Sequence, residues 1–288
     1  MPFACIHTHT TFCDGSDDIE TCCSAAHQKG LSSIGFSAHA PITAKTGIKN
    51  SWNLADDRLP VYIEAVLAAK KRWEGMLPVY LGLEVDFIEN LMGPADRDFQ
   101  DLGLDFIIGS VHFIFPPKGA PFTVDDSTKN VIQGIKEGFG GESMAMVEAY
   151  WNSEEAMIKS GGFDLLGHPD LVKVNNAENT LFSEEGDFHR QKTAAIAALM
   201  AKTGLPAEVN TGGLNRLRIK ECYPSPPFLK LFCEQGVPMV INADAHKALD
   251  LDGHYSEARE AMLTAGYTET VLFAGREQGK AIWRPVRL

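Results

Sequence analysis

The feature that most constrains this chain is a regular alternation of short apolar runs with longer amphipathic stretches. The apolar runs have the length of buried strands, and the stretches between them have helical spacing. Buried strands separated by helices predict a parallel sheet with right-handed crossovers. The predicted strands lie at residues 3–6, 33–37, 78–83, 105–109, 163–167, 206–209 and 237–241.

Six of these seven strands end in, or run directly into, a side chain that can bind a metal. In extended backbone alternate side chains point to the same side, so His7 and His9 can converge on one point. An open doubly wound sheet would gather such residues at one switch point, whereas ligands from six strand ends imply closure into a ring. We therefore predict a seven-stranded α/β barrel. The candidate ligands are His7, His9, His39, Glu84, His112, His168, Asp244 and His246, with Asp14 as a ninth.

Metal binding explains this set of side chains better than packing does. Any one of the histidines alone would more simply be a hydrogen-bonded core residue. Burying so many ionisable groups together without an ion is costly, however. One metal takes three or four protein ligands, so the set implies two or three divalent ions with a bridging carboxylate. Nitrogen and oxygen ligands without thiolate favour zinc, manganese or iron. The remaining histidines, His27, His189 and His254, are expected at the surface.

Composition and charge are those of an ordinary globular protein, which we interpret as one domain spanning residues 1–288. Hydrophobic residues make up 44% of the chain and charged residues 22%. The net charge of −12 disfavours nucleic acid and anionic membranes as partners, and means that an anionic substrate needs a local positive centre. No apolar run approaches the ~20 residues that span a bilayer, and no signal peptide is visible, so we expect a cytoplasmic protein. The six cysteines contain no Cys-x-x-Cys pair and are expected to be reduced.

Several stretches between the strands have the features of helices. The first is expected to begin at a capping-box spacing between Asp17 and Glu20 and to end at Gly30. The segment 115–141 is rich in Pro and Gly and is interpreted as an irregular loop that could cover the site. A last apolar run occupies residues 270–273. The other helices are predicted at residues 57–73, 95–102, 143–159, 188–202, 227–235 and 255–263.

The motifs at the strand ends resemble, in order, those of the polymerase and histidinol phosphatase (PHP) family. The resemblance extends from residue 7 to about residue 255. Within the family, three stretches are most similar to the histidinol-phosphate phosphatases: Ser110-Val111-His112-Phe113, Glu208-Val209-Asn210-Thr211-Gly212-Gly213 and Tyr223-Pro224-Ser225-Pro226. The family motifs themselves are His7-Thr8-His9-Thr10 with Asp14-Gly15, Ser37-Ala38-His39, Gly82-Leu83-Glu84, Gly109-Ser110-Val111-His112, Gly167-His168-Pro169-Asp170 and Asp244-Ala245-His246.

The resemblance implies a distorted (βα)7 TIM-like barrel with a trinuclear metal site. Carried over position by position, one metal would take His7, His9, Glu84 and Asp244. A second metal would take Glu84, His112 and His168, so that Glu84 bridges. The third metal would take Asp14, His39 and His246.

The implied activity is hydrolysis of L-histidinol phosphate to histidinol and phosphate, a step of histidine biosynthesis. Metal ions a few Å apart lower the pKa of a shared water, and the resulting hydroxide attacks phosphorus. Glu84, Asp244 and His246 are the expected catalytic residues, and the proton donor to the leaving alcohol is left open between Asp244, His246 and a metal-bound water.

The expected substrate contacts are cations and one aromatic side chain. Arg can fork onto phosphate, and Lys acts as a point charge. By resemblance, Arg216 and Lys173 are chosen, with Arg218 as the alternative to Arg216. Trp52 could cover the imidazole of histidinol. Glu208 is expected either to orient a metal ligand or to form a structural ion pair.

Three other functions compete with this interpretation. The same site could cleave a nucleotide or a phosphodiester. A metal-dependent amidohydrolase or deaminase is disfavoured, because Glu84 stands at the third strand end and His246 follows Asp244. A non-catalytic metal-binding module is disfavoured because all nine ligand positions are kept. The sequence leaves the oligomeric state open.

Overall fold

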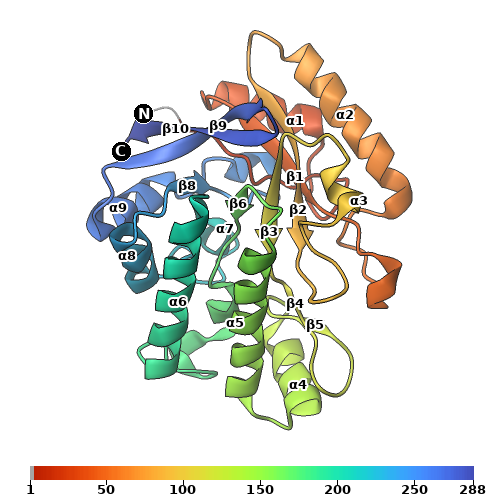
Figure 1. The fold of residues 1–288 in the computed structure, drawn as a ribbon. Helices are drawn as coiled ribbons and strands as arrows, with labels where there is room; N and C mark the ends of the chain where they lie inside the picture. The colour runs from red at the N-terminus through yellow and green to blue at the C-terminus, as the bar shows by residue number, and fades with distance from the viewer. Residues whose placement is uncertain (1–2) are drawn as a thin grey trace.

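The computed structural model describes residues 3–288 and is organised around one curled parallel sheet (Figure 1). The strand order is β1-β2-β3-β6-β7-β8, and each neighbouring pair runs parallel. Buried strands joined by helices produce this arrangement, which confirms the predicted α/β class. The six strands are β1 (Ile34–His39), β2 (Val79–Asp86), β3 (Phe106–Ser110), β6 (Leu165–Leu166), β7 (Ala207–Asn210) and β8 (Met239–Asn242).

The N-terminal segment takes the seventh position of the ring. The prediction of a regular strand at residues 3–6 is wrong in detail, because only isolated parallel bridges form there. Cys5 bridges Ile34 on β1, and Thr8 bridges Ala245 just beyond β8. Main-chain hydrogen bonds run on both sides of this segment, from Ser37 N to Thr8 O at 3.0 Å and from Ala245 N to His7 O at 3.0 Å. The segment therefore joins the two edges of the sheet, as the barrel prediction requires.

Helices flank the outside of the sheet in Figure 1. The first helix begins one residue later than predicted, because the carboxylate that accepts from Thr21 N belongs to Asp18. None of the described helices is long and apolar enough to cross a membrane. All six cysteines lie in the described part of the chain and are unpaired. The helices are α1 (Ile19–Gln28), α2 (Leu59–Arg72), α3 (Arg97–Gln100), α4 (Thr128–Phe139), α5 (Ser143–Ser160), α6 (Asp187–Thr203), α7 (Gly212–Asn215), α8 (Pro226–Glu234) and α9 (Tyr255–Ala265), with short 3-10 turns η1 (Ala44–Thr46), η2 (Asp56–Arg58), η3 (Leu171–Asn175), η4 (Ala177–Asn179) and η5 (Ala248–Asp250).

The segment 115–141 is more ordered than expected. It contains β5 (Phe122–Thr123), which pairs with β4 (Phe113–Ile114), and the helix α4. The glycines that suggested a loop permit close packing: a Cβ on Gly134 would lie 2.6 Å from the Phe122 ring, and one on Gly138 would lie 2.4 Å from Pro116. The interpretation as an irregular loop is therefore wrong for residues 128–139.

A C-terminal hairpin covers the end of the sheet opposite β4 and β5 (Figure 1). Its strands are β9 (Glu269–Glu277) and β10 (Lys280–Arg287), of which the sequence predicted only an apolar run at 270–273. Phe273 packs against Phe106 of β3, with ring centroids 5.3 Å apart, and against Trp283 at 5.2 Å. The hairpin thus closes the barrel at one end and leaves the C-terminal strand ends for the site.

Candidate metal centre

The nine predicted ligands all lie in one cluster at the C-terminal strand ends. Every one of them belongs to at least one group of three or four donors whose atoms lie within 4.8 Å of one another. Seven of the side chains are buried, while Asp14 and His246 are partly open to solvent. The groups are His9 with Asp14, His39 and His246; His7 with Glu84 and His168; His7 with His9 and Asp244; and His39 with Glu84 and His112.

Glu84 lies at the centre of this cluster, and its two oxygens face different histidines. Its Oε1 lies 3.0 Å from His168 Nε2 and 3.7 Å from His112 Nε2. Its Oε2 lies 2.9 Å from His39 Nδ1 and 3.2 Å from His7 Nε2. A carboxylate held between two sets of imidazoles has the geometry of a bridging ligand.

His7 and His9 are brought together as the alternating pattern predicted. Between them, Thr8 is fixed to β1 by a hydrogen bond from its N–H to Ser37 Oγ at 3.0 Å. His9 Nε2 then lies 3.3 Å from Asp244 Oδ1, and His7 Nε2 lies 3.7 Å from the same oxygen. Asp244 has a left-handed backbone with φ of 49°, a conformation that is uncommon outside glycine and is frequent at functional sites.

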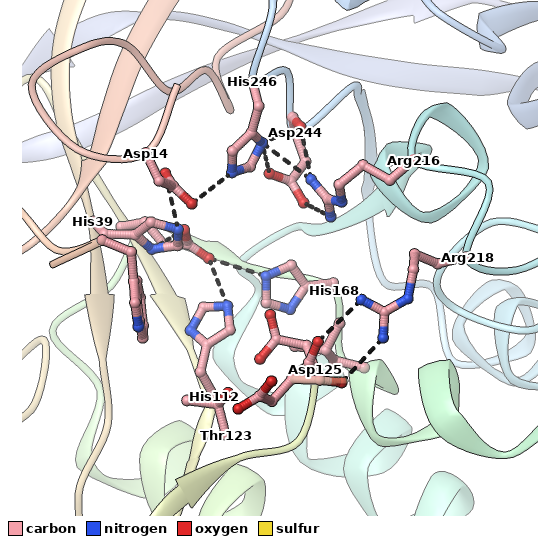
Figure 2. Close-up of a pocket in the computed structure, with 14 residues that line it drawn as sticks. Asp14, His39, His112, Thr123, Asp125, His168, Arg216, Arg218, Asp244 and His246 are labelled. Carbon is pink, nitrogen blue, oxygen red and sulfur yellow. Dashed lines mark hydrogen bonds and ion pairs between the residues drawn. The ribbon is translucent and has the colours of Figure 1, made fainter. Parts of the chain in front are cut away.

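Asp14 and His246 form the open side of the cluster. Figure 2 shows the Asp14 carboxylate against the His246 ring, where Oδ2 lies 3.1 Å from Nε2. The other oxygen of Asp14 lies 3.7 Å from both His9 and His39. The loop can come this close because Gly15 has no side chain: a Cβ there would lie 2.4 Å from the backbone of His9.

Two buried carboxylates contact the rings of candidate ligands from outside the cluster. Glu208 lies 3.0 Å from His7 Nδ1 and accepts a hydrogen bond from the His168 main-chain N–H at 2.8 Å. Asp86 lies 2.8 Å from His112 Nδ1. Such partners fix the ring orientation of ligating histidines and make them more basic. The sequence pointed to Glu208 but missed Asp86, although Asp86 follows Glu84 by two residues on the same face of β2.

The ionisable groups of the cluster shift one another's pKa in both directions: although burial opposes the charged form, nearby carboxylates raise the pKa of His7 and His39. Burial disfavours ionisation of Glu84, yet the surrounding histidines hold the pKa of its carboxyl well below its usual range. Burial lowers the pKa of His9 to about 3, helped by His39 and His246. His9 is therefore neutral, as a ligand to a divalent metal must be.

Buried polar atoms of the cluster that lack hydrogen-bond partners also indicate bound ions. Among the described residues, five ring or carboxylate atoms of the cluster are buried without a hydrogen-bond partner, namely His7 Nε2, His9 Nε2, His39 Nδ1, His168 Nδ1 and Glu84 Oε2. Buried polar atoms normally have a partner, and bound ions would supply one here. The nitrogen and oxygen donor set therefore fits divalent metal ions.

A cavity of about 410 Å³ opens onto the cluster. Arg216 enters it from the turn after α7 and lies 2.9 Å from Asp244 Oδ2 and 3.0 Å from His246 Nδ1 (Figure 2). Arg218 also lines the cavity, and its guanidinium donates to main-chain carbonyls. The other residues of the wall are Trp52, Thr123, Asp125, Asp126 and Leu171.

The other expected substrate contacts differ in position. Trp52 lines the cavity, where its ring stacks on Phe113 and meets His39 edge-on. Lys173 is not part of this wall. Its ammonium group donates to Glu221 at 2.7 Å and to the Cys222 carbonyl at 2.9 Å.

His189, which was expected at the surface, is buried outside the cluster. Its ring lies 5.5 Å from Trp151 and 5.3 Å from Phe182. Burial lowers the pKa of His189, so it serves as a neutral core side chain. His27 is exposed, as predicted, whereas His254 is half-buried.

Two curated proteins are similar to this chain over most of its length. A Deinococcus radiodurans protein inferred to be a histidinol-phosphatase is 29% identical over 274 residues, which cover 94% of this chain and 96% of that protein. The histidinol-phosphatase of Bacillus subtilis is 27% identical over 261 residues, covering 86% of this chain and 95% of the relative.

Solved structures with the same fold also cover nearly the whole chain. A Listeria monocytogenes protein inferred to be the histidinol phosphatase hisK superposes with a TM-score of 0.77 at 24% identity, covering 88% of this chain and 98% of that one. The histidinol phosphate phosphatase of Lactococcus lactis, solved with zinc, L-histidinol and phosphate, superposes with a TM-score of 0.68 at 21% identity, covering 97% and 98%. The family model of the PHP domain matches residues 6–212, and the chain therefore belongs to the PHP domain family.

Proposed function

We propose that this protein is a metal-dependent phosphomonoesterase that hydrolyses L-histidinol phosphate to L-histidinol and phosphate, a step of histidine biosynthesis. The observation that carries the proposal is the nine-donor cluster with Arg216 in the same cavity. The substrate is suggested by the curated relatives from Deinococcus radiodurans and Bacillus subtilis, whose similarity covers most of this chain. A chain of the same fold, that of Lactococcus lactis, holds zinc, L-histidinol and phosphate together.

Three divalent ions of zinc, manganese or iron fit the cluster best. The position of Glu84 between two sets of imidazoles supports its assignment as a bridge between two of these ions. His7, His9 and His39 each belong to two of the four donor groups, so the proposed sites adjoin one another. We assign His7, His9, Glu84 and Asp244 to one ion, Glu84, His112 and His168 to the second, and Asp14, His39 and His246 to the third.

The bound ions would supply an activated water at neutral pH and would neutralise the phosphoryl oxygens. The side chains of the protein position the other groups. Arg216 carries a planar fork that suits two phosphoryl oxygens, and it already contacts Asp244 and His246. Asp244, His246 and a metal-bound water are the candidate proton donors to the leaving alcohol. Because the overall charge is −12, a dianionic ester is attracted by this local centre alone.

The test combines metal analysis with a substrate panel. The purified protein is stripped with a chelator and reloaded separately with zinc, manganese or iron. Phosphate release is then measured from histidinol phosphate, AMP, glycerol phosphate and a phosphodiester. We expect loss of activity on stripping, recovery on reloading, and the highest kcat/KM for histidinol phosphate.

The outcomes separate the competing functions. Activity that survives complete metal removal would refute the proposed chemistry. Preference for AMP or for the diester would keep the metal centre but replace the substrate. Stoichiometric metal without any turnover would favour a non-catalytic module. His168→Ala removes a candidate ligand and should lose both metal and turnover, and its matched control is His27→Ala, because His27 is an exposed histidine outside the cluster.

A further inference from the structure

One carboxylate in the wall of the active cavity is not used by the metal cluster. Asp125 lies between β5 and α4 and lines the cavity together with Arg216 and Arg218. Its side chain belongs to none of the donor groups of the cluster. Within residues 3–288, no protein group forms a hydrogen bond or an ion pair with its carboxylate.

The backbone around Asp125, in contrast, is firmly held. Asn175 donates from its side-chain amide to the carbonyls of Val124 and Asp126, each at 2.9 Å. Arg218 donates to the carbonyls of Asp125 and Asp126 at 3.2 and 3.1 Å. Val124 N–H donates to the His112 carbonyl at 2.9 Å, which ties this segment to a metal-ligating loop. Asp125 is thus fixed in place while its charged end stays unpartnered, a preorganised arrangement that suits ligand binding.

The carboxylate of the next residue, Asp126, does have hydrogen-bond partners. Asp126 accepts a hydrogen bond from the side-chain amide of Asn130 at 3.0 Å and also accepts from Ser127 N–H. Its charge therefore supports the first turn of α4, near the positive end of the helix dipole. Two adjacent aspartates have different environments, and only Asp125 is left without a partner.

A negative charge at this place opposes phosphate binding, because like charges in a confined cavity repel. Its presence is explained if the rest of the substrate carries a positive charge. In L-histidinol phosphate the ammonium group is on the carbon next to the one that bears the ester oxygen. A carboxylate that binds this ammonium group must therefore lie in the same cavity as the phosphate cations, as Asp125 does.

We propose that Asp125 determines specificity by binding the primary ammonium group of the alcohol part of the substrate. This inference rests on the proposed function. It extends that function from a phosphate ester in general to esters of amino alcohols. Arg218 and Asn175 act as positioning residues for the Asp125 backbone.

The experiment compares two esters in the metal-loaded enzyme, histidinol phosphate and the same ester without its amino group, imidazolylpropyl phosphate. For Asp125→Asn we expect the ratio of the two kcat/KM values to fall by about tenfold to a hundredfold, the range of a charged hydrogen bond. The loss should appear mainly as a higher KM for histidinol phosphate, because the ammonium contact is made before and during the reaction alike. Asp125→Glu should restore part of the preference, and Asp101→Asn, an exposed change outside the cavity, is the control.

Inorganic phosphate supplies a second measurement. Removing a negative charge from the cavity should strengthen inhibition by phosphate in Asp125→Asn, whereas general damage to the site would weaken it. Equal losses for both esters, or an unchanged ratio, would overturn the inference while the phosphatase function stands. Absence of any phosphomonoesterase activity in the wild-type enzyme would overturn the proposed function, and this inference with it.

Discussion

His7 and Glu208 form a fully buried pair inside the barrel, with His7 Nδ1 3.0 Å from Glu208 Oε2. The opposite ring nitrogen of His7 faces Glu84 and Asp244 in the metal cluster. Although burial opposes the charged form of Glu208, the contact with His7 lowers the pKa of its carboxyl. Glu208 also accepts from His168 N–H, so one carboxylate orients two proposed ligands.

The first prediction concerns this pair. Glu208→Gln should weaken metal binding by about 10- to 100-fold, the usual effect of removing a carboxylate behind a ligating histidine. The metal dissociation constant is measured by competition with a chelator, and activity is measured at saturating metal. Glu260→Gln, an exposed change on α9, is the control. If Glu208→Gln lowered only the thermal stability and left metal affinity as in the wild type, the pair would be purely structural.

A second prediction concerns the central carboxylate. Because Glu84 contacts histidines of two donor groups, Glu84→Ala should lower the metal content by two ions per chain and remove nearly all turnover. Elemental analysis of the purified variant and single-turnover phosphate release measure the two effects. Glu89→Gln, at an exposed position shortly after β2, should behave as the wild type. A near-normal metal content in Glu84→Ala would refute the bridging role.

The two arginines of the cavity should differ in their effects. Arg216→Lys keeps a charge but loses the planar fork, so we expect the inhibition constant of inorganic phosphate to rise by roughly tenfold. The guanidinium of Arg218 donates hydrogen bonds to main-chain carbonyls, so Arg218→Lys should give a smaller rise in the inhibition constant of phosphate. Measuring phosphate inhibition in both variants decides which arginine contacts the phosphate. A larger effect in Arg218→Lys would reverse the assignment.

The clustering of the nine candidate ligands could be predicted from the sequence because strand ends carry strong local signals. An apolar run followed by His or Glu places the side chain at a known edge of the sheet, and parallel strands bring such edges together. The alternation that placed His7 and His9 side by side held even though the segment forms bridges rather than a regular strand. Local pattern and global topology agree at these positions.

Features that depend on contacts distant in sequence could not be predicted. Lys173 follows the candidate ligand His168 by five residues, but its ammonium group contacts Glu221 and does not line the cavity. The strand β10 is mostly exposed or half-buried, so it lacks the apolar pattern of the inner strands. In α4 the glycines indicated a loop, whereas packing against Phe122 and Pro116 requires them inside a helix. In each case tertiary packing outweighed the local signal.

A fourth prediction concerns the effect of close packing inside the barrel on stability. A Cβ on Gly82 of β2 would lie 2.4 Å from the ring of Phe106, which is fully buried. Gly82→Ala should therefore lower the free energy of unfolding by about 1–3 kcal/mol, as overpacking does. Urea unfolding measures the change. Phe106→Leu removes part of the ring, so the double variant should lose less than the sum of the single changes; strict additivity would show that the two residues do not compete for space.

The last prediction uses a buried acid outside the metal cluster. Glu154 of α5 is fully buried, and the Tyr150 hydroxyl donates to its Oε1 at 2.9 Å. Burial raises the pKa of Glu154 well above its ordinary value of 4.5, so the folded protein keeps a proton that the unfolded chain releases. The contribution of Glu154 to stability is therefore fully present below about pH 4.5 and declines as the pH rises toward the folded pKa.

Glu154→Gln replaces the neutral acid by an amide that does not titrate, so it should remove this decline. Relative to the wild type, the variant should gain up to about 1.4 kcal/mol of unfolding free energy for each pH unit above 5, until the folded pKa is reached. Urea unfolding at pH 5, 6, 7 and 8 with saturating metal measures the difference, and Glu148→Gln, an exposed change on the same helix, provides the reference. A difference between Glu154→Gln and wild type that stays constant with pH would mean that Glu154 is ionised in the folded protein. Burial of the charge would then have to be offset by a partner other than Tyr150.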